Sequence, residues 1–191
     1  QLHIVNMKNI LFKIKLILIS RYPRWTGQVA VMFLIMCIAF GIWLCKAKIG
    51  LKKKIISAIL FFYSFNLLVI TLLMRPVQEE RDFNPLPFFL SEYGKSNRGG
   101  WDWIFNVILF VPLGLMLVYL INHKNRIMYT MLIGAGTTLA IEFSQYFSRL
   151  GSFELDDLIA NTLGTAVGIV VYFLAKKLYI KYVKNKRLSS E

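Results

Sequence analysis

The chain has 191 residues, of which 57% are hydrophobic, and its mean hydropathy is +0.56. These values are typical of integral membrane proteins and argue against a soluble domain, because several apolar runs approach the length that crosses about 30 Å of hydrocarbon. The net charge of +13 does not indicate nucleic acid binding, since the basic residues flank the apolar runs, where membrane topology and anionic lipid headgroups account for them.

Histidine and cysteine usage gives no basis for a cofactor site. The two histidines, His3 and His123, are not near a cluster of carboxylates, so a histidine-rich zinc or di-iron centre is not expected. Cys37 and Cys45 fall within one predicted helix, too far apart along it to form a disulfide bond. We therefore expect neither a metal nor another cofactor.

Five apolar runs have the length of transmembrane helices. In chain order they cover residues 26–45, 55–74, 101–121, 127–147 and 156–174. The sequence therefore predicts an all-α integral membrane bundle of about five transmembrane helices. We place these helices in a single domain, residues 25–180, between a basic N-terminal segment, 1–24, and a basic tail, 181–191.

Basic residues in the connections predict the orientation of these helices. Five lysines occupy residues 46–54, and further basic residues fill the turn 123–126 and the tail 176–187. The positive-inside rule places all three segments in the cytoplasm, and the C-terminus with them. The connections 75–100 and 149–156, which contain acidic residues, then face outward.

The N-terminal segment departs from this pattern. Five crossings leave residues 1–24 on the outer side, although this segment carries five basic residues. Residues 4–20 form either an interfacial amphipathic helix or a sixth crossing. The side of the membrane on which the N-terminus lies therefore stays open.

Polar residues at membrane depth form stripes on the last two predicted helices. At 100° per residue, Glu142, Gln145 and Arg149 fall within roughly 60° of one helical face. Asp157 and Asn161 share a face of the next helix with two glycines, within about 40° of one another. Ionisable groups inside a bilayer are expensive unless they are paired or wetted, so these stripes indicate a functional site.

Other predicted helices bring polar residues to the same outer membrane boundary. Glu142 lies about one turn inside that boundary, where helix capping is not available. It therefore needs Arg75, Arg149 or a water-filled cavity as its partner. The candidate functional cluster consists of Arg75, Asn106, Glu142, Gln145, Arg149, Asp156, Asp157 and Asn161.

Structural roles compete with a functional one at most of these positions. Asp156 and Asp157 are placed to cap a helix N-terminus, with Asp156 offset by about 100° and therefore more available to water. Arg149 and Asp157 are placed to form an ion pair across a short turn, which is weak evidence for stability. Asn106 and Asn161 are of the type that hydrogen-bonds between membrane helices.

Small residues predict where the helices approach each other closely. Gly164 and Gly168 have the small-xxx-small spacing that lets membrane helices pack backbone to backbone. Gly114 is a further candidate for helix packing. Pro112 is expected to kink the third helix, because its missing N–H frees a carbonyl near Ile108 that needs another donor.

Several of these residues fall into motifs that resemble the VanZ-like family of small membrane proteins. The first is Asn-Pro-Leu-Pro-Phe at 84–88, followed by Asn-Val-Ile-Leu-Phe-Val-Pro-Leu-Gly at 106–114. The most specific is Ile-Glu-Phe-Ser-Gln at 141–145, followed by Arg149 and by Asp-Asp-Leu-Ile-Ala-Asn-Thr-Leu-Gly-Thr-Ala-Val-Gly at 156–168. This combination is hard to produce by chance.

The resemblance covers roughly residues 75–175, whereas the N-terminal third matches in hydrophobic character alone. It implies a multi-pass protein of a bacterial, mostly Gram-positive, plasma membrane. Founding members of the family are associated with reduced susceptibility to teicoplanin-type lipoglycopeptides. Because one fold hosts many functions, membership transfers the fold better than the phenotype.

Three functions are compatible with the sequence. The favoured hypothesis is a non-enzymatic protein that lowers glycopeptide engagement through a polar cluster at the outer membrane interface. An enzyme acting on a lipid-linked envelope precursor is the main alternative, although no recognised catalytic motif is present. A small transporter or flippase that uses buried acids as a proton relay is the third. Membrane lipids are expected partners in each case, together with a lipoglycopeptide or an envelope precursor in the first two.

Overall fold

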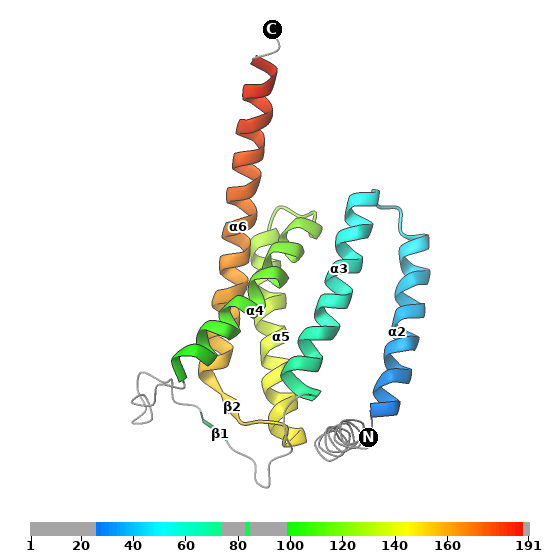
Figure 1. Ribbon diagram of the computed structural model, residues 1–191, viewed down its shortest axis with the longest axis vertical. Helices are drawn as coiled ribbons and strands as arrows, with labels where there is room; N and C mark the ends of the chain where they lie inside the picture. The colour runs from blue at the N-terminus through cyan, green and yellow to red at the C-terminus, as the bar shows by residue number, and fades with distance from the viewer. Residues whose placement is uncertain (1–25, 74–82, 85–98, 189–191) are drawn as a thin grey trace, which may run out of the picture. The chain divides into compact units, whose positions relative to one another are not determined.

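The computed structural model describes residues 26–73, 83–84 and 99–188. Within these ranges the chain forms five α-helices, one π-helical segment and two short strands (Figure 1). Their bounds are α2 Thr26–Lys46, α3 Leu51–Leu68, η1 Val69–Leu73, β1 Phe83–Asn84, α4 Gly99–Leu120, α5 Arg126–Ser148, β2 Phe153–Glu154 and α6 Leu155–Leu188. The all-α prediction is confirmed, and the predicted segment 1–24 lies outside the described residues.

The chain divides into two compact units, Gln1–Gly50 and Leu51–Glu191. The described part of the first unit is α2, whose large apolar side chains, such as Val31, Ile35 and Trp43, are exposed. A helix that is apolar on all sides is typical of a membrane span. The remaining described elements belong to the second unit, which holds the candidate site.

Four of the described helical segments are long and apolar enough to cross a membrane. They are Leu51–Leu72, Trp103–Leu120, Arg126–Ser148 and Leu155–Arg187, whereas Val31–Lys46 in α2 is a shorter apolar stretch. Many of their large apolar side chains face outward, including Ile59, Phe105 and Leu132. Outward-facing apolar side chains on helices of this length are expected where the surrounding solvent is lipid.

α4 and α6 run parallel and pack backbone against backbone. A Cβ atom added to Gly164 would lie 2.2 Å from the carbonyl oxygen of Val107, and one added to Gly168 would lie 2.2 Å from that of Val111. A Cβ atom added to Gly114 would lie 2.2 Å from the backbone carbonyl oxygen of α6 that faces it. Larger residues at these positions would separate the helices, so the small-xxx-small spacing of α6 packs on α4.

α5 runs antiparallel to α6 and is held in register by two contacts. The side chain of Asn161 donates a hydrogen bond from Nδ2 to Oγ1 of Thr138 at 2.8 Å. One turn earlier on α5, a Cβ atom added to Gly134 would lie 2.5 Å from Oγ1 of Thr165. The glycine therefore makes room for a buried threonine one turn further along α6.

Aromatic and basic side chains mark the end of the unit where α4 joins α5. The guanidinium carbon of Arg126 lies 5.3 Å from the ring centre of Tyr172 and 4.9 Å from that of Phe173. The rings of Tyr119 and Tyr172 are 6.3 Å apart. Tyrosine and arginine gather at membrane–water interfaces, so this level of α6 is expected to lie at one membrane boundary.

Pro112 lies inside α4, which continues on both sides of it. The freed carbonyl was predicted near Ile108. The structure provides a donor one residue further on, because the hydroxyl of Tyr63 on α3 donates to the carbonyl of Leu109. α3 therefore supports α4 near the proline, beside an apolar core formed by Leu67, Phe110, Leu113 and Ile141.

A short parallel strand pair, which the sequence did not predict, joins residues far apart in the chain. Phe83 of β1 pairs with Phe153 of β2, and their rings stack with centres 4.9 Å apart. The ring of Phe83 also meets that of Tyr146 edge to face at 5.9 Å. These contacts tie residues 83–84 to the turn between α5 and α6.

The largest difference from the prediction is the length of α6. The helix was expected to end near residue 174, but it continues to Leu188. Lysine is a good helix former, and a helix that is already nucleated propagates at little further cost. The basic tail therefore extends the last membrane helix as a continuous α-helix.

Candidate functional site

Polar side chains from four described elements gather at one end of the second unit. They come from the C-terminal ends of η1 and α5 and from the N-terminal ends of α4 and α6, which lie at the same end of the bundle (Figure 1). Of the predicted cluster, Asn106, Glu142, Gln145, Asp157 and Asn161 are buried or half-buried. Arg75 lies outside the described residues.

Asn106, seven residues into α4, meets Asp157 in the first turn of α6. Nδ2 of Asn106 donates a hydrogen bond to Oδ1 of Asp157 at 2.5 Å. Asp157 is 9% exposed, whereas Asp156 is half-exposed, which is the difference that their angular offset predicts. Both acids lie in the first turn of α6, where the helix dipole favours negative charge. Asp157 therefore lies where the helix dipole favours its charge and also accepts a hydrogen bond from a neighbouring helix.

Asn161 lies one turn further along α6 than Asp157, where polar side chains form a seam between α5 and α6. This polar seam consists of Thr138, Asn161 and Thr165. Besides its bond to Thr138, Asn161 accepts a hydrogen bond at its backbone carbonyl from Oγ1 of Thr165 at 3.1 Å. Thr138 and Thr165 are both fully buried. Hydroxyl and amide groups thus replace apolar packing along this helix interface, a common form of hydrogen bonding between membrane helices.

Glu142 supports the turn that leads into α6. Its Oε2 accepts a hydrogen bond from the backbone N–H of Glu154 in β2 at 2.9 Å, and Glu142 is only 1% exposed. The carboxylate of Glu154 in turn accepts a hydrogen bond from the hydroxyl of Ser152 at 2.5 Å. The antiparallel register of α5 and α6, extended by one turn, places Glu142 at the level of Asp157. Two carboxylates of the predicted cluster therefore belong to the same layer of the site.

Gln145 links α5 to the π-helical end of the second membrane segment. Its Nε2 donates a hydrogen bond to the backbone carbonyl of Thr71 in η1 at 2.8 Å. The hydroxyl of Thr71 bonds back to the carbonyl of Leu67, four residues earlier. A π-helical turn widens the backbone and is frequent at functional sites. Here it presents a carbonyl to an amide on a neighbouring helix.

Arg149 ends α5 in a left-handed conformation, with φ of 59° and ψ of 26°. Its own N–H and that of Leu150 both point to the carbonyl of Gln145, which closes the last turn of the helix. This conformation is usually taken by glycine or asparagine. Arg149 is exposed, whereas Glu142, seven residues earlier, is buried.

Two buried amides retain unused acceptors. Within the described part of the chain, Oε1 of Gln145 and Oδ1 of Asn161 accept no hydrogen bond, and Oγ1 of Thr162 also lacks a partner. Gln145 is 1% exposed and Asn161 3% exposed. Buried polar atoms are normally satisfied, so these atoms are places where the site can receive a hydrogen-bond donor.

Charge is divided between the two ends of the second unit. Where side chains are described, its acidic residues lie at the site end, and Arg149 is the basic residue that joins them there. The acidic residues are Glu142, Glu154, Asp156 and Asp157. The basic residues at the opposite end are Lys52, Lys53, Lys54, Lys124, Arg126, Lys176, Lys177, Lys181, Lys184, Lys186 and Arg187.

The site offers carboxylates, amides and hydroxyls at one end of long apolar helices. Among the described residues there is no group of three or more His, Cys, Asp or Glu side chains that could hold a metal ion. Cys37 and Cys45, in α2, are free thiols. The donor and acceptor set is suited to hydrogen bonding with the polar part of an amphiphile.

Sequence reasoning did not single out several residues that build the site. Thr138 and Thr165 are buried partners of the seam, and the backbone groups of Thr71 and Glu154 receive or donate key hydrogen bonds. Thr138 lies four residues after Gly134, so the helical period could have indicated its position on the buried face. Backbone partners carry no comparable sequence signal.

The fold and the site define a small multi-pass helical membrane protein. Its buried acidic and amide side chains gather at one end of the helical bundle. A sequence profile of the VanZ/LLP1 family matches residues 29–176. The chain therefore belongs to the VanZ/LLP1 family, as the motifs around Glu142 and Asp157 predicted.

One curated relative is Protein VanZ of Enterococcus faecium. It is 30% identical over 81 residues, which cover 40% of this chain and 47% of that protein. The aligned part thus spans about half the length of the curated relative. No solved structure matches the chain.

Proposed function

We propose that this protein reduces susceptibility to teicoplanin-type lipoglycopeptides through the polar cluster, with that cluster facing the outer side of the plasma membrane. Membership of the VanZ/LLP1 family and the similarity to Protein VanZ support a role of this type. Because the aligned part covers 47% of that relative, similarity alone does not assign its activity to this chain.

The observation that carries the proposal is the buried polar layer at one end of apolar helices. Glu142 and Asp157 lie at the same level, and two amides near them retain unused acceptors. A lipoglycopeptide combines a polar peptide scaffold with an acyl chain, so it meets the membrane at its interface. A cluster of this composition and depth can hydrogen-bond to the polar part while lipid accommodates the chain.

The division of charge supports the outward orientation. With the basic end of the second unit in the cytoplasm, the cluster opens toward the cell wall, where glycopeptides act. The opposite orientation would place the cluster on the wrong side of the membrane for this function.

Expression in a susceptible, non-pathogenic laboratory Gram-positive host tests the proposal. We expect the teicoplanin inhibitory concentration to rise, with a smaller change for a glycopeptide that lacks an acyl chain. Glu142→Gln and Asp157→Asn should abolish the rise, because each removes a charge while keeping nearly the same shape. Ser144→Ala is the matched control, since Ser144 is exposed on the same helix and bonds locally to Ala140.

The amount of protein in the membrane must be equal for all variants, as measured by immunoblotting of a tagged chain. No change in teicoplanin susceptibility when the unaltered protein is present in the membrane contradicts the proposal. Equal loss of the effect in Ser144→Ala would remove the assignment to the cluster.

The layer shared by Glu142 and Asp157 also favours one alternative, an enzyme that acts on a lipid-linked envelope precursor. Two carboxylates in different surroundings can divide acid and base roles. Purified protein incubated with a labelled lipid-linked precursor, with and without Mg²⁺, distinguishes the two functions. An unaltered precursor alongside reduced teicoplanin susceptibility in cells supports the non-enzymatic function.

A further inference from the structure

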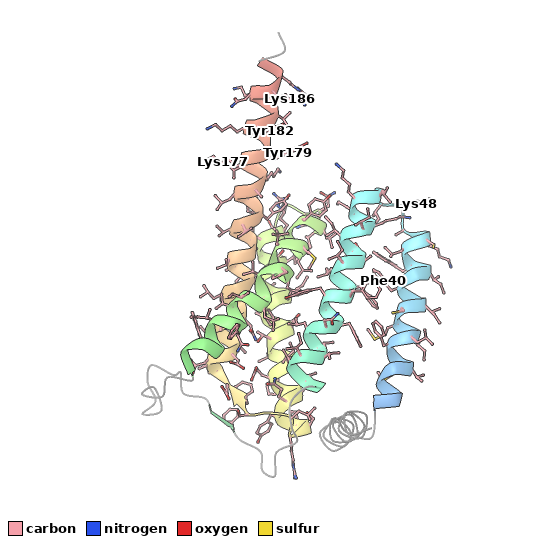
Figure 2. All side chains as sticks on the ribbon, viewed as in Figure 1. Phe40, Lys48, Lys177, Tyr179, Tyr182 and Lys186 are labelled. Atoms are coloured by element: carbon pink, nitrogen blue, oxygen red, sulfur yellow. The ribbon has the colours of Figure 1, made fainter. Side chains whose placement is uncertain are left out.

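The last part of α6 extends well beyond the helices that pack against it. Tyr172 contacts Arg126 at the start of α5, so this level of α6 corresponds to the α4–α5 turn. Beyond Phe173 the helix continues through residues 174–188, or about 22 Å at 1.5 Å per residue. We refer to residues 174–188 as the α6 extension. Figure 2 shows side chains projecting from it at Lys177, Tyr179, Tyr182 and Lys186.

The α6 extension has a basic face and an apolar face. It contains six basic residues and no acidic ones. Five of them fall within about 140° of the helix circumference: Lys176, Lys177, Lys181, Lys184 and Arg187. Leu178, Tyr179 and Tyr182 lie within about 100° on the other side. The exceptions are Ile180 and Leu188, whose positions fall on the basic face, and Lys186, whose position falls on the apolar face.

The apolar face of the extension is open. Leu178 and Tyr179 are each 67% exposed, and Tyr182 is 65% exposed. Large apolar side chains gathered on one exposed face of a helix indicate that a surface covers them.

The positive charge of the extension distinguishes between the partners that could cover its apolar face. A second copy of this chain that paired through the apolar face would bring the two Lys186 side chains, which lie on that face, toward each other. Like charges oppose that pairing. An anionic surface is complementary, and a basic amphipathic helix with tyrosines is typical of segments that bind a membrane surface.

The bilayer surface is the anionic partner that is always within reach. The headgroup layer is roughly 5–7 Å thick on each side, so an upright extension would hold its last residues about 15 Å beyond the headgroups. That distance exceeds the Debye length of about 8 Å, and the attraction of those charges would be lost. An extension that leans onto the surface brings Tyr179 and Tyr182 to the interface. A helix is about 10–12 Å across, so its basic side chains then lie within roughly a Debye length of the headgroups.

We propose that the α6 extension binds anionic lipid headgroups by leaning onto the membrane surface, with Leu178, Tyr179 and Tyr182 in the interface and the basic side chains held within a Debye length of the lipid phosphates. This binding site is separate from the polar cluster, because it lies at the opposite end of the second unit. It does not depend on the proposed role in glycopeptide susceptibility, nor on which side of the membrane this end faces.

The test uses the full chain, with Cys37→Ser and Cys45→Ser, labelled at Tyr182→Cys with an environment-sensitive nitrobenzoxadiazole probe. The protein is reconstituted in vesicles of phosphatidylcholine alone or mixed with phosphatidylglycerol. We expect a blue-shifted emission and a several-fold lower quenching by aqueous iodide in the anionic vesicles. High salt should reverse both changes, because the attraction between surface charges is screened.

Two sets of lysine variants localise the effect. Replacing Lys176, Lys177, Lys181 and Lys184 together by Gln should leave the probe exposed in anionic vesicles. The matched control removes the same number of charges at the same end of the unit by replacing Lys52, Lys53, Lys54 and Lys124, and it should retain the shift. Because the altered residues of the extension lie outside the packed helices, thermal unfolding of the bundle should be unchanged.

Three results would overturn the proposal. The first is equal emission and quenching in neutral and anionic vesicles. The second is protection of the probe that rises with the density of protein in the vesicles, because this would identify a second copy as the occupant. The third is retention of the shift after the four lysines of the extension are replaced.

Discussion

Gly164→Ala is the sharpest test of the packing that positions the site. An added Cβ atom would lie 2.2 Å from the carbonyl oxygen of Val107 and 2.9 Å from Cβ of Phe110. Ordinary contacts begin near 3.4 Å, so α4 and α6 would have to separate by about 1 Å at this point. The obstacle is backbone, which cannot move aside by changing a rotamer.

The expected loss of stability follows from two contributions. Overpacking of a tight contact destabilises by about 1–3 kcal/mol. Separation of the helices would also lengthen the 2.5 Å bond between Asn106 and Asp157 toward the limit of a hydrogen bond, which removes about 1 kcal/mol more. We therefore expect Gly164→Ala to lower the free energy of unfolding by about 2–4 kcal/mol.

Unfolding by sodium dodecyl sulfate in mixed micelles, followed by circular dichroism, measures this loss. Gly136→Ala is the matched control, because nothing lies within 4 Å of an added Cβ atom there. Alanine is the better helix former by about 1 kcal/mol, so this control should equal or exceed the unaltered protein in stability. Equal stability of Gly164→Ala and the unaltered protein would refute the backbone contact.

The contact at Gly134 provides a second comparison, because its neighbour is a side chain. An added Cβ atom there would lie 2.5 Å from Oγ1 and 2.6 Å from Cγ2 of Thr165. Thr165→Ala removes both atoms, so it should recover much of the stability lost by Gly134→Ala. It should recover nothing in Gly164→Ala. Equal recovery in both pairs would contradict the distinction between backbone and side-chain obstacles.

Three further predictions concern the polar cluster. Asn106→Leu should lower the free energy of unfolding by about 1–3 kcal/mol in the same titration, because it removes a hydrogen bond to the buried Asp157. An unchanged midpoint would contradict this. Glu142→Gln keeps an acceptor for the β2 amide and should be more stable than Glu142→Leu by about 1–3 kcal/mol; equal stability would show that this bond contributes nothing. The last prediction uses single cysteines introduced into a chain without native cysteines. On intact cells, an impermeant maleimide should label Ser148→Cys and should not label Lys124→Cys. The reverse labelling pattern would place the cluster in the cytoplasm.

Much of the fold follows from the sequence because hydropathy and small-residue spacing act over short distances. The predicted starts of the third, fourth and fifth helices, at residues 101, 127 and 156, lie within two residues of those of α4, α5 and α6. Hydropathy could not place the end of α6, because it detects where a helix leaves hydrocarbon and not where the helix stops. The end at Leu188 depends on helix propagation through basic residues.

The site was less predictable because its hydrogen bonds depend on register. The helical period put Glu142 and Gln145 on one face, but it did not indicate that their partners would be backbone groups of Glu154 and Thr71. A carbonyl in a π-helical turn has no residue signature. The β1–β2 pair also could not be predicted, because two residues are too few for a strand pattern and the pairing depends on contacts between distant parts of the chain.

The structure gives the buried members of the cluster a structural partner, and this determines how their function can be assigned. Asp157 bonds to Asn106, Asn161 to Thr138, and Glu142 to the β2 amide. A variant that loses activity because the helices move apart would be indistinguishable from one that loses a chemical group. Isosteric changes separate the two cases, because Glu142→Gln and Asp157→Asn keep the shape and one acceptor oxygen where a hydrogen bond is received, while an NH2 group replaces the second carboxyl oxygen. Loss of function with an unchanged unfolding midpoint would assign the charge to function, whereas parallel loss of both would assign it to architecture.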